Sequence, residues 1–323
     1  MPPGLSPAAS SGDETREGIR VEIELTGPNY YRESARNRNR TTIIQGSLRF
    51  LVGSDSTMPA VVLESVSKVF HHRPALFNWF GRERTGETRA LDRVSLEVPS
   101  GRVLVLLGPN GSGKTTTLKL ISTMLLPDSG RILVQGVDTT TSAEVVRERV
   151  GFAVATERSF FPRLSARENL DFFAALDDIP RKARAEKVDD LLYRTGLHHS
   201  ADTLVMKFSS GMYQRLGIAR ALIKKPSVVL LDEPTRSLDP GSAALFWNLV
   251  RGLPAEGTTV ILATHNFNEA AAVGNQVAIL FQGELAAEMN LSGTFRVEDL
   301  RSFYFQTTGE LEEVEPATSR GGR

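Results

Sequence analysis

The sequence contains no cysteine among its 323 residues. Disulfide bonds, thiolate metal sites and cysteine nucleophiles are therefore excluded. Long apolar runs are also missing, since the longest candidates, such as Val103–Leu107 and residues 277–281, are only strand length. A membrane-spanning helix needs roughly 20 apolar residues, so any work at a membrane requires a partner. The first residues lack the apolar stretch of a signal peptide, and we expect none.

A net charge is absent as well, because 38 Lys and Arg residues balance 38 Asp and Glu residues. No overall field attracts nucleic acid, and no nucleic-acid partner is expected. The hydrophobic content of 41% and charged content of 24% are ordinary for a globular protein that buries a core. No internal repeat divides the chain, which predicts one copy of the folded unit rather than two.

Composition divides the chain into three segments. Residues 1–57 are rich in Ser, Pro and Gly and carry a basic run, which predicts a disordered extension or an upstream start-codon artefact. A regulatory or docking extension is the alternative. Residues 58–290 form the predicted folded domain, with a helical insertion at about 157–225. Residues 291–323 become acidic and then rich in Gly and Arg, and are predicted to be a tail.

From residue 60 onward, short apolar runs alternate with longer amphipathic ones, as in βα units. Strands are predicted at residues 61–69, 94–98, 103–107, 132–134, 150–154, 228–231, 259–263 and 277–281. The strand pattern disappears between residues 164 and 226, where three helices are predicted at 165–176, 181–195 and 210–224. Ser165 and Glu168 have the spacing of a capping box at the start of the first of these helices. The fold class is therefore α/β.

The strongest motif follows the predicted strand at 103–107 and opens a helix at residues 114–123. It matches the pattern G-x-x-x-x-G-K-[ST]. Glycines let the backbone wrap phosphates closely, and the helix N-terminus adds its positive dipole end. Lys114 is expected to reach the β- and γ-phosphates, and the Thr115 hydroxyl to ligate Mg²⁺. The predicted ATP-binding residues here are Gly108, Pro109, Asn110, Gly111, Ser112, Gly113, Lys114, Thr115 and Thr116.

A second motif lies where the apolar strand at 228–231 ends in two carboxylates. Asp232 is predicted to hold Mg²⁺, and Glu233 to polarise an attacking water. Alone the motif is weak, since many strands end in acidic residues. Downstream of a phosphate-binding loop it is specific.

With these two motifs the chain resembles the ATPase subunit of ABC transporters, over roughly residues 60–288. Further matches carry the resemblance: a signature-like stretch at residues 208–212 (FSSGM), a loop Ser237-Leu238-Asp239-Pro240, and His265 just past a strand. In the family the signature contacts ATP bound to the opposite subunit, which the resemblance assigns to Ser209, Ser210, Gly211, Met212 and Asp239. Read alone, Ser209 or Ser210 is simply a helix N-cap. His265 corresponds to a γ-phosphate sensor, and Phe70 to an aromatic that stacks on adenine; a strand-end core residue is the alternative for Phe70.

The resemblance implies a P-loop NTPase core, with a mostly parallel sheet flanked by helices, an N-terminal antiparallel β subdomain and an inserted helical subdomain. It also implies ATP and Mg²⁺ as ligands, and Glu233 and His265 as the catalytic residues. Two copies of the cassette, or one and a paralogue, would sandwich ATP head-to-tail. Integral membrane permease subunits would complete the transporter at the cytoplasmic face of the cell membrane.

The sequence departs from the family at two places. The family has a Gln near the metal, but the stretch VGFAVATERSFF has none; Thr156 or Ala155 takes that place, with Glu157 next. A water-mediated Thr156 contact to Mg²⁺ is the favoured substitute, and a Glu157 carboxylate the alternative. The second departure is an insertion at residues 71–88, which is basic and aromatic. It is predicted to be an exposed hairpin or loop, or else a contact to the partner or the membrane surface.

The signature-like stretch and the segment that follows the missing Gln resemble ATPases of bacterial exporters of polysaccharides and drugs. Export is therefore the expected direction. An importer ATPase is the alternative within transport, and a soluble ABC ATPase of translation or DNA repair is the alternative outside it. Such soluble proteins usually carry two cassettes or a long coiled coil, and this sequence has neither.

Overall fold

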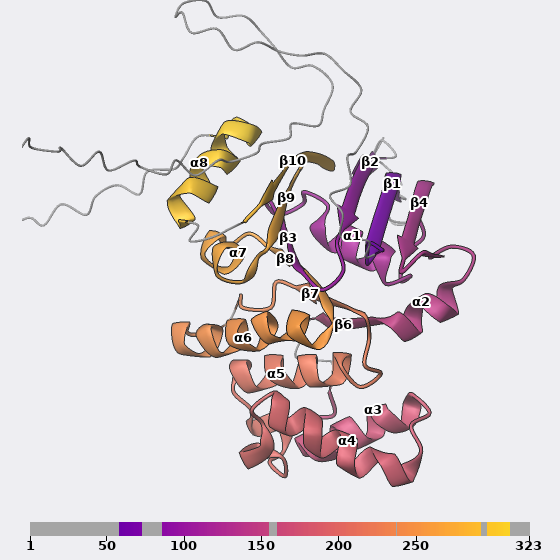
Figure 1. Ribbon diagram of the computed structural model, residues 1–323, viewed down its shortest axis with the longest axis vertical. Helices are drawn as coiled ribbons and strands as arrows, with labels where there is room; N and C mark the ends of the chain where they lie inside the picture. Colours follow the sequence, from indigo (N-terminus) through magenta and orange to yellow (C-terminus); the bar gives the residue numbers. More distant parts are fainter. Residues whose placement is uncertain (1–57, 73–85, 155–159, 237, 292–295, 311–323) are drawn as a thin grey trace, which may run out of the picture.

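The computed structural model describes residues 58–72, 86–154, 160–236, 238–291 and 296–310. An antiparallel sheet in the order β2-β1-β4-β5 forms one part of the fold (Figure 1). Its strands are β1 (Val61–His72), β2 (Gly86–Val98), β4 (Ser129–Val134) and β5 (Val137–Asp138). The antiparallel N-terminal sheet expected from the sequence is thereby confirmed.

The second sheet has six strands in the order β10-β9-β3-β8-β7-β6. All neighbouring pairs are parallel except β9 and β10, which are antiparallel. The strands are β3 (Val103–Leu107), β6 (Val150–Val154), β7 (Val228–Asp232), β8 (Thr259–Thr264), β9 (Gln276–Phe281) and β10 (Glu284–Asn290). Every residue of β3 and β8 is buried, as expected for strands covered on both faces. The predicted α/β core is thus confirmed.

Eight helices lie in the described part of the chain. They are α1 (Lys114–Ile121), α2 (Ala143–Arg149), α3 (Ala166–Leu176), α4 (Arg181–Arg194), α5 (Ser210–Ala221), α6 (Pro240–Gly252), α7 (Phe267–Val273) and α8 (Val297–Thr308). Short 3₁₀ segments lie at His198–Ser200, Val205–Lys207 and Leu253–Glu256. Within the described ranges, no helix combines the length and the apolar content that crossing a membrane requires.

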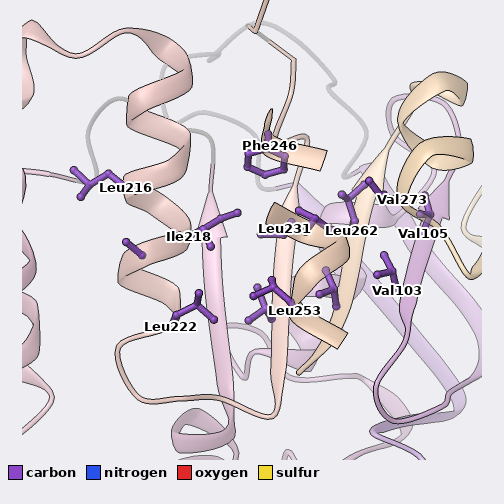
Figure 2. Close-up of a cluster of buried hydrophobic side chains, with 14 of the residues drawn as sticks. Val103, Val105, Leu216, Ile218, Leu222, Leu231, Phe246, Leu253, Leu262 and Val273 are labelled. Atoms are coloured by element: carbon purple, nitrogen blue, oxygen red, sulfur yellow. The ribbon is translucent and has the colours of Figure 1, made fainter. Parts of the chain in front are cut away.

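The two faces of the six-stranded sheet bury different clusters of side chains. On one face, alternate strand residues such as Leu104 and Leu106 pack with α1 and the antiparallel sheet. On the other face, Val105 and its neighbours pack with α3 to α8. Figure 2 shows the second cluster, in which apolar side chains of α5 and α6 lie beside Leu231 and Leu262 of the sheet. The alternation follows from the twofold side-chain period of a strand. As a result, α1 and α5 lie on opposite faces.

Helices α3, α4 and α5 pack against one another within the stretch where the sequence lost its strand pattern. In Figure 1, α3 and α4 lie at the end of the molecule away from the antiparallel sheet, with α5 between them and α6. Helix α5 also packs on β6, where Gly151 lets the backbones approach: a Cβ at Gly151 would lie 2.2 Å from the carbonyl oxygen of Ala221. The helical layer is therefore fixed directly to the edge of the parallel sheet.

Several boundaries differ from the sequence expectation, at strands as well as at helices. Helix α1 ends at Ile121 rather than residue 123, and Thr123 has a left-handed φ of 62°, which cannot continue a helix. Helix α5 ends at Ala221 rather than residue 224. The segment expected to be a tail contains α8, whose Leu300, Phe303 and Tyr304 are buried against the core.

The expected insertion at residues 71–88 extends two paired strands at its ends. His71 pairs with Glu87 and His72 with Gly86, as β1 and β2 continue beyond the predicted strands. Residues 73–85 lie outside the described part, as do residues 1–57 and 311–323.

The capping box at the start of α3 provides a test of local helix stability. Ser165 Oγ accepts from the Glu168 amide at 3.2 Å, and the Glu168 carboxylate accepts from the Ser165 amide at 2.7 Å. We expect Ser165→Ala to lower the free energy of unfolding by about 1 kcal/mol, the usual loss for an N-cap. Ser142→Ala is the matched control, because Ser142 stands at the N-cap of α2 without a side-chain capping bond. Denaturant unfolding checks both variants, and equal losses would contradict the prediction.

Candidate active site

The loop between β3 and α1 is held in a shape that only glycine permits at two positions. A Cβ at Gly108 would lie 2.1 Å from the carbonyl oxygen of Leu280, and one at Gly113 would lie 2.6 Å from that of Ala90. Gly113 also has a φ of 107°, which side chains rarely adopt. The predicted phosphate-binding loop, residues 108–116, is therefore wedged between β9 on one side and β2 on the other.

This loop presents an unsatisfied donor next to a helix N-terminus. Ser112 is 2% exposed, and its Oγ has no hydrogen-bond partner among the described residues. No acidic side chain occupies the first turn of α1, where backbone N–H groups remain free to bind an anion. A buried hydroxyl and free amides together suit phosphate oxygens. The geometry thus fits the ATP-binding role predicted for this loop.

Lys114 is buried at the base of the loop, and only 5% of it is exposed. Its Nζ donates to the carbonyl oxygens of Gly108 at 2.7 Å and Pro109 at 3.0 Å, and lies 3.7 Å from Glu233 Oε1. Burial lowers the pKa of Lys114, while the carboxylates of Glu233 and Asp232 oppose this by favouring the charged form. A cation held beneath the loop in this way is placed to attract phosphate oxygens.

Thr115 and Asp232 bring two oxygen ligands together from different elements. Thr115 Oγ1, in the first turn of α1, donates to Asp232 Oδ1 at the end of β7 over 3.1 Å. Burial raises the pKa of Asp232, and the Thr115 hydrogen bond opposes this. No group of three His, Cys, Asp or Glu side chains suitable for a metal occurs in the described part. A hydroxyl and one carboxylate fit Mg²⁺, which usually keeps waters and takes other ligands from phosphate.

Glu233 and His265 meet at the ends of neighbouring strands. His265 Nδ1 lies 2.9 Å from a carboxylate oxygen of Glu233. Strands β7 and β8 are parallel, with Asp232 opposite Ala263, so both side chains emerge at the same edge of the sheet. The Glu233 side chain is 19% exposed and that of His265 is 51% exposed. The carboxylate is therefore shielded but open on the side of the loop, as a base acting on water requires.

The backbone at Glu233 adopts an unusual conformation. Its φ is 47°, a left-handed value that costs a residue with a side chain about 1–3 kcal/mol. The Glu233 amide donates to the Ala263 carbonyl at 2.9 Å, which holds this conformation in place. Strain of this kind is concentrated at functional sites, and here it aims the carboxylate at Lys114 and His265.

The signature-like residues start a helix on the other face of the sheet. Ser209 is the N-cap of α5 and accepts from the Met212 amide at 3.2 Å. Gly211 packs closely on Ser242, since a Cβ there would lie 2.9 Å from Ser242 Oγ. Asp239 caps α6 by accepting from the amides of Gly241 and Ser242, each at 3.0 Å. Within one chain these residues therefore act as helix caps, and α5 and α1 cover opposite faces of the sheet.

Phe70 lies close to the phosphate-binding loop. It is half-buried on β1 and pairs with Thr88 of β2. Ala90, two residues after Thr88 on the same strand, has its carbonyl packed against Gly113 of the loop. Lys68 Nζ stands 5.8 Å from the centroid of the Phe70 ring. This position is compatible with adenine stacking, which stays a prediction. Thr156 and Glu157 lie outside the described residues, so the substitute for the missing Gln also stays a prediction.

One buried residue of the site was not assigned from the sequence. Glu269 is fully buried on α7, four residues after His265. The available signal was an acidic residue inside the apolar helix FNEAAAV, where a solvent-exposed position was the simpler reading. Thr235 and Thr264, which flank the two catalytic positions, are also buried.

Comparisons with known proteins identify the family of this chain. The family model described as ABC transporter matches residues 91–236. The chain is 41% identical over 207 residues to the daunorubicin resistance ATP-binding protein DrrA3 of Streptomyces coeruleorubidus, a match that covers 64% of this chain and 65% of that protein. It is 35% identical to the ABC transporter ATP-binding protein NatA of Bacillus subtilis, covering 67% of this chain and 89% of that protein.

Solved structures of ATP-binding cassettes have a similar fold. The ATP-binding cassette MJ0796, described as dimeric in a post-hydrolysis state bound to ADP and phosphate, matches with a TM-score of 0.60 and 27% identity. That match covers 72% of this chain and 99% of the cassette. These matches add to two features of the chain itself, which are the phosphate-binding loop and the strand that ends in Asp232 and Glu233. The chain belongs to the family of ABC transporter ATP-binding proteins.

Proposed function

We propose that this protein hydrolyses ATP as the energy-supplying subunit of an ABC-type exporter. The observation that carries the proposal is the meeting of Glu233 with His265 at 2.9 Å beside Lys114 and the phosphate-binding loop. A nucleotide-binding loop alone would serve a scaffold equally well. A carboxylate paired with an imidazole at the same edge of the sheet is a hydrolytic arrangement.

The residues divide the work of hydrolysis. The loop amides, the Ser112 hydroxyl and Lys114 bind and orient the β- and γ-phosphates. Glu233 accepts a proton from the attacking water, and His265 orients the Glu233 carboxylate and senses the γ-phosphate. Thr115 and Asp232 would hold Mg²⁺, which supplies charge neutralisation on the phosphate oxygens. ATP is the nucleotide supported by the family, and Phe70 would bind its adenine by stacking.

A second copy of the chain, or a paralogue, is needed to complete each site. Because α1 and α5 cover opposite faces of the sheet, the signature-like residues of one chain are not placed to cap the phosphate on its own loop. A head-to-tail dimer would bring Ser209, Ser210, Gly211, Met212 and Asp239 of one chain to the ATP of the other. The N-terminus of α5, with free backbone amides, suits the γ-phosphate. The relative MJ0796 is described as dimeric.

The membrane partner would be an integral permease subunit, which the helical layer of α3, α4 and α5 would contact. For this helical layer we propose bounds of about 157–225, within an ATPase domain of 58–290. This places the protein peripherally at the cytoplasmic face of the cell membrane. Export is favoured over import because relatives are described as daunorubicin resistance and Nod factor export ATP-binding proteins. Those relatives are matched over about two thirds of their own length, so their cargo is not transferred to this chain.

Reconstitution tests the proposed function. The purified chain should release phosphate from ATP only when Mg²⁺ is present, and faster with a permease subunit, to be sought as a multi-span protein among the products of the neighbouring genes. An absence of turnover in both settings would show that the Glu233–His265 pair does not work as proposed. A neighbouring gene for a substrate-binding protein would favour import instead.

Thr115 provides the test of the magnesium site. We expect Thr115→Ala to raise the Mg²⁺ concentration for half-maximal ATPase about tenfold, because one of the two protein oxygens at the site is lost. Titrating ATPase against free Mg²⁺ at saturating ATP measures this. Thr140→Ala on the connection after β5 is the control, since Thr140 lies outside the site. An unchanged magnesium requirement in Thr115→Ala would remove Thr115 from the metal site.

A further inference from the structure

The carboxylate of Glu269, which has no role in the proposed hydrolysis, is buried on α7, the helix that follows His265. Glu269 has no exposed surface, although ionisable side chains are almost never fully buried unless they are paired. In the described structure it forms no ion pair with Lys or Arg. Its place on α7, four residues after His265, puts it next to the loop that carries the sensor histidine. A buried charge in this position needs a reason, since burial costs free energy.

The Glu269 carboxylate accepts one hydrogen bond from another helix, and its second oxygen, Oε2, has no hydrogen-bond partner in the described structure. Trp247 on α6 donates its indole Nε1–H to Glu269 Oε1 over 3.4 Å. Burial raises the pKa of Glu269, and the hydroxyls of Thr264 and Thr235 and the Trp247 indole oppose this by favouring the ionised form. Thr264 ends β8, and Thr235 follows β7 in the turn that leads to α6. The Glu269 side chain therefore joins α7, which follows His265, to α6, with Thr264 and Thr235 in its surroundings.

Further hydrogen bonds hold the turn around His265, between the end of β8 and the start of α7. The Asn266 amide donates to Thr264 Oγ1 at 3.0 Å, and Asn266 Oδ1 accepts from the amides of Asn268 at 2.9 Å and Glu269 at 3.4 Å. The turn from Thr264 to Glu269 is thus tied at both ends, with His265 inside it. Any shift of the Glu269 side chain is transmitted to the His265 backbone through this turn.

We propose that Glu269 is a positioning residue, which ties α7 to Trp247 of α6 so that His265, just before α7, stays within hydrogen-bond distance of Glu233. The inference rests on the proposed ATPase function. Glu269 does not touch the nucleotide, and it acts on catalysis only through the placement of His265. The position of an imidazole against a carboxylate is sensitive to small shifts, since a misplacement of about 1 Å can lower a rate about 100-fold.

The test is Glu269→Gln, which keeps the shape of the side chain and an oxygen for Trp247 but removes the charge. We expect kcat for ATP hydrolysis to fall about tenfold while the Kd for ATP changes less than about twofold, because the phosphate-binding loop is untouched. In a His265→Ala background the same substitution should have no further effect on kcat. Trp247→Phe removes only the donor and should lower kcat less.

Glu288→Gln is the matched control. Glu288 is a partly buried carboxylate that, like Glu269, accepts a hydrogen bond from a side-chain N–H, here from Gln276 Nε2 at 3.0 Å. It lies on β10, away from the site. Tryptophan fluorescence reports on the Trp247–Glu269 contact independently of activity. The sequence has two tryptophans, so in a Trp79→Phe background Trp247 is the one that remains. Glu269→Gln should then shift its fluorescence emission. Emission and kcat in Glu269→Gln that match the parent protein would overturn the proposal.

Two other outcomes are decisive. A lower melting temperature with unchanged kcat per folded molecule would show a purely structural role and overturn the proposal. An additive loss in the His265→Ala background would show that Glu269 does not act through His265. If Glu269→Gln fails to fold, Trp247→Phe carries the kcat comparisons, with and without His265→Ala. A parent protein without ATPase would instead refute the proposed function, whereas an active parent with an equally active Glu269→Gln variant refutes only this inference.

Discussion

Glu233→Gln should abolish nearly all ATP hydrolysis while leaving ATP binding intact. The amide cannot accept the proton of the attacking water, and loss of a positioned general base typically lowers a rate about 10²- to 10⁴-fold. Gln has the shape of Glu and should retain the contact to His265 and the left-handed backbone. ATP affinity should stay close to that of the parent protein, because the phosphates are held by the loop and Lys114.

Slow hydrolysis should also change the oligomeric state. If ATP closes a head-to-tail dimer and hydrolysis opens it, the Glu233→Gln protein should elute as a dimer in ATP and as a monomer without nucleotide. Phosphate release and size-exclusion chromatography measure the two effects on one preparation. Glu284→Gln, at an exposed position on β10, is the control and should behave as the parent protein. Undiminished hydrolysis together with a monomer in ATP would remove Glu233 from the mechanism.

Lys114→Ala should impair binding itself. The ammonium group now donates to two loop carbonyls and lies 3.7 Å from Glu233, so it is already desolvated where phosphate would arrive. Hydrogen bonds to charged groups contribute about 1.5–3 kcal/mol, which predicts a loss of ATP affinity of about 10- to 100-fold. Removal of the cation also takes the ammonium group 3.7 Å from Glu233 away from the two carboxylates, which would then repel the phosphates more strongly.

Calorimetry with ATP in the absence of Mg²⁺ isolates this effect from turnover. Lys119→Ala is the matched control, because Lys119 lies in the last turn of the same helix and is exposed. Its affinity should equal that of the parent protein. Equal ATP affinity in Lys114→Ala and the parent would mean that residues 108–116 do not bind phosphate through this side chain.

Sequence patterns predicted most of the elements because they are local signals. A continuous apolar run at residues 228–231 that ends in two acids indicates a buried strand with polar groups at its end, and β7 has that form. The spacing of Ser165 and Glu168 predicted a capping box, which is present. Helix α8 was not predicted, since residues 297–308 have a weak pattern and their order depends on Tyr304 and Phe305 packing against Phe267 of α7.

In the candidate site, too, local motifs were predictable from the sequence, whereas contacts between distant residues were not. The motif at residues 108–116 is contiguous, and its glycine spacing alone implies a phosphate-binding loop. The strand that ends in two acids predicted the role of Glu233, and the resemblance to a family supplied that of His265, 32 residues further on. Their 2.9 Å contact exists because β7 and β8 are neighbours in the parallel sheet. Strand order is a tertiary property that the periodicity of each strand does not specify.

The sequence by itself determined an α/β chain with a phosphate-binding loop and a strand that delivers two carboxylates, because these features depend on residues next to one another. Only the tertiary structure decided which distant groups meet. It set Thr115 against Asp232, buried Glu269 behind His265, and separated α1 from α5 across the sheet. The physical reason is that burial and side-chain distance depend on how strands are ordered and which face each helix covers, and that choice is made by packing of the whole core.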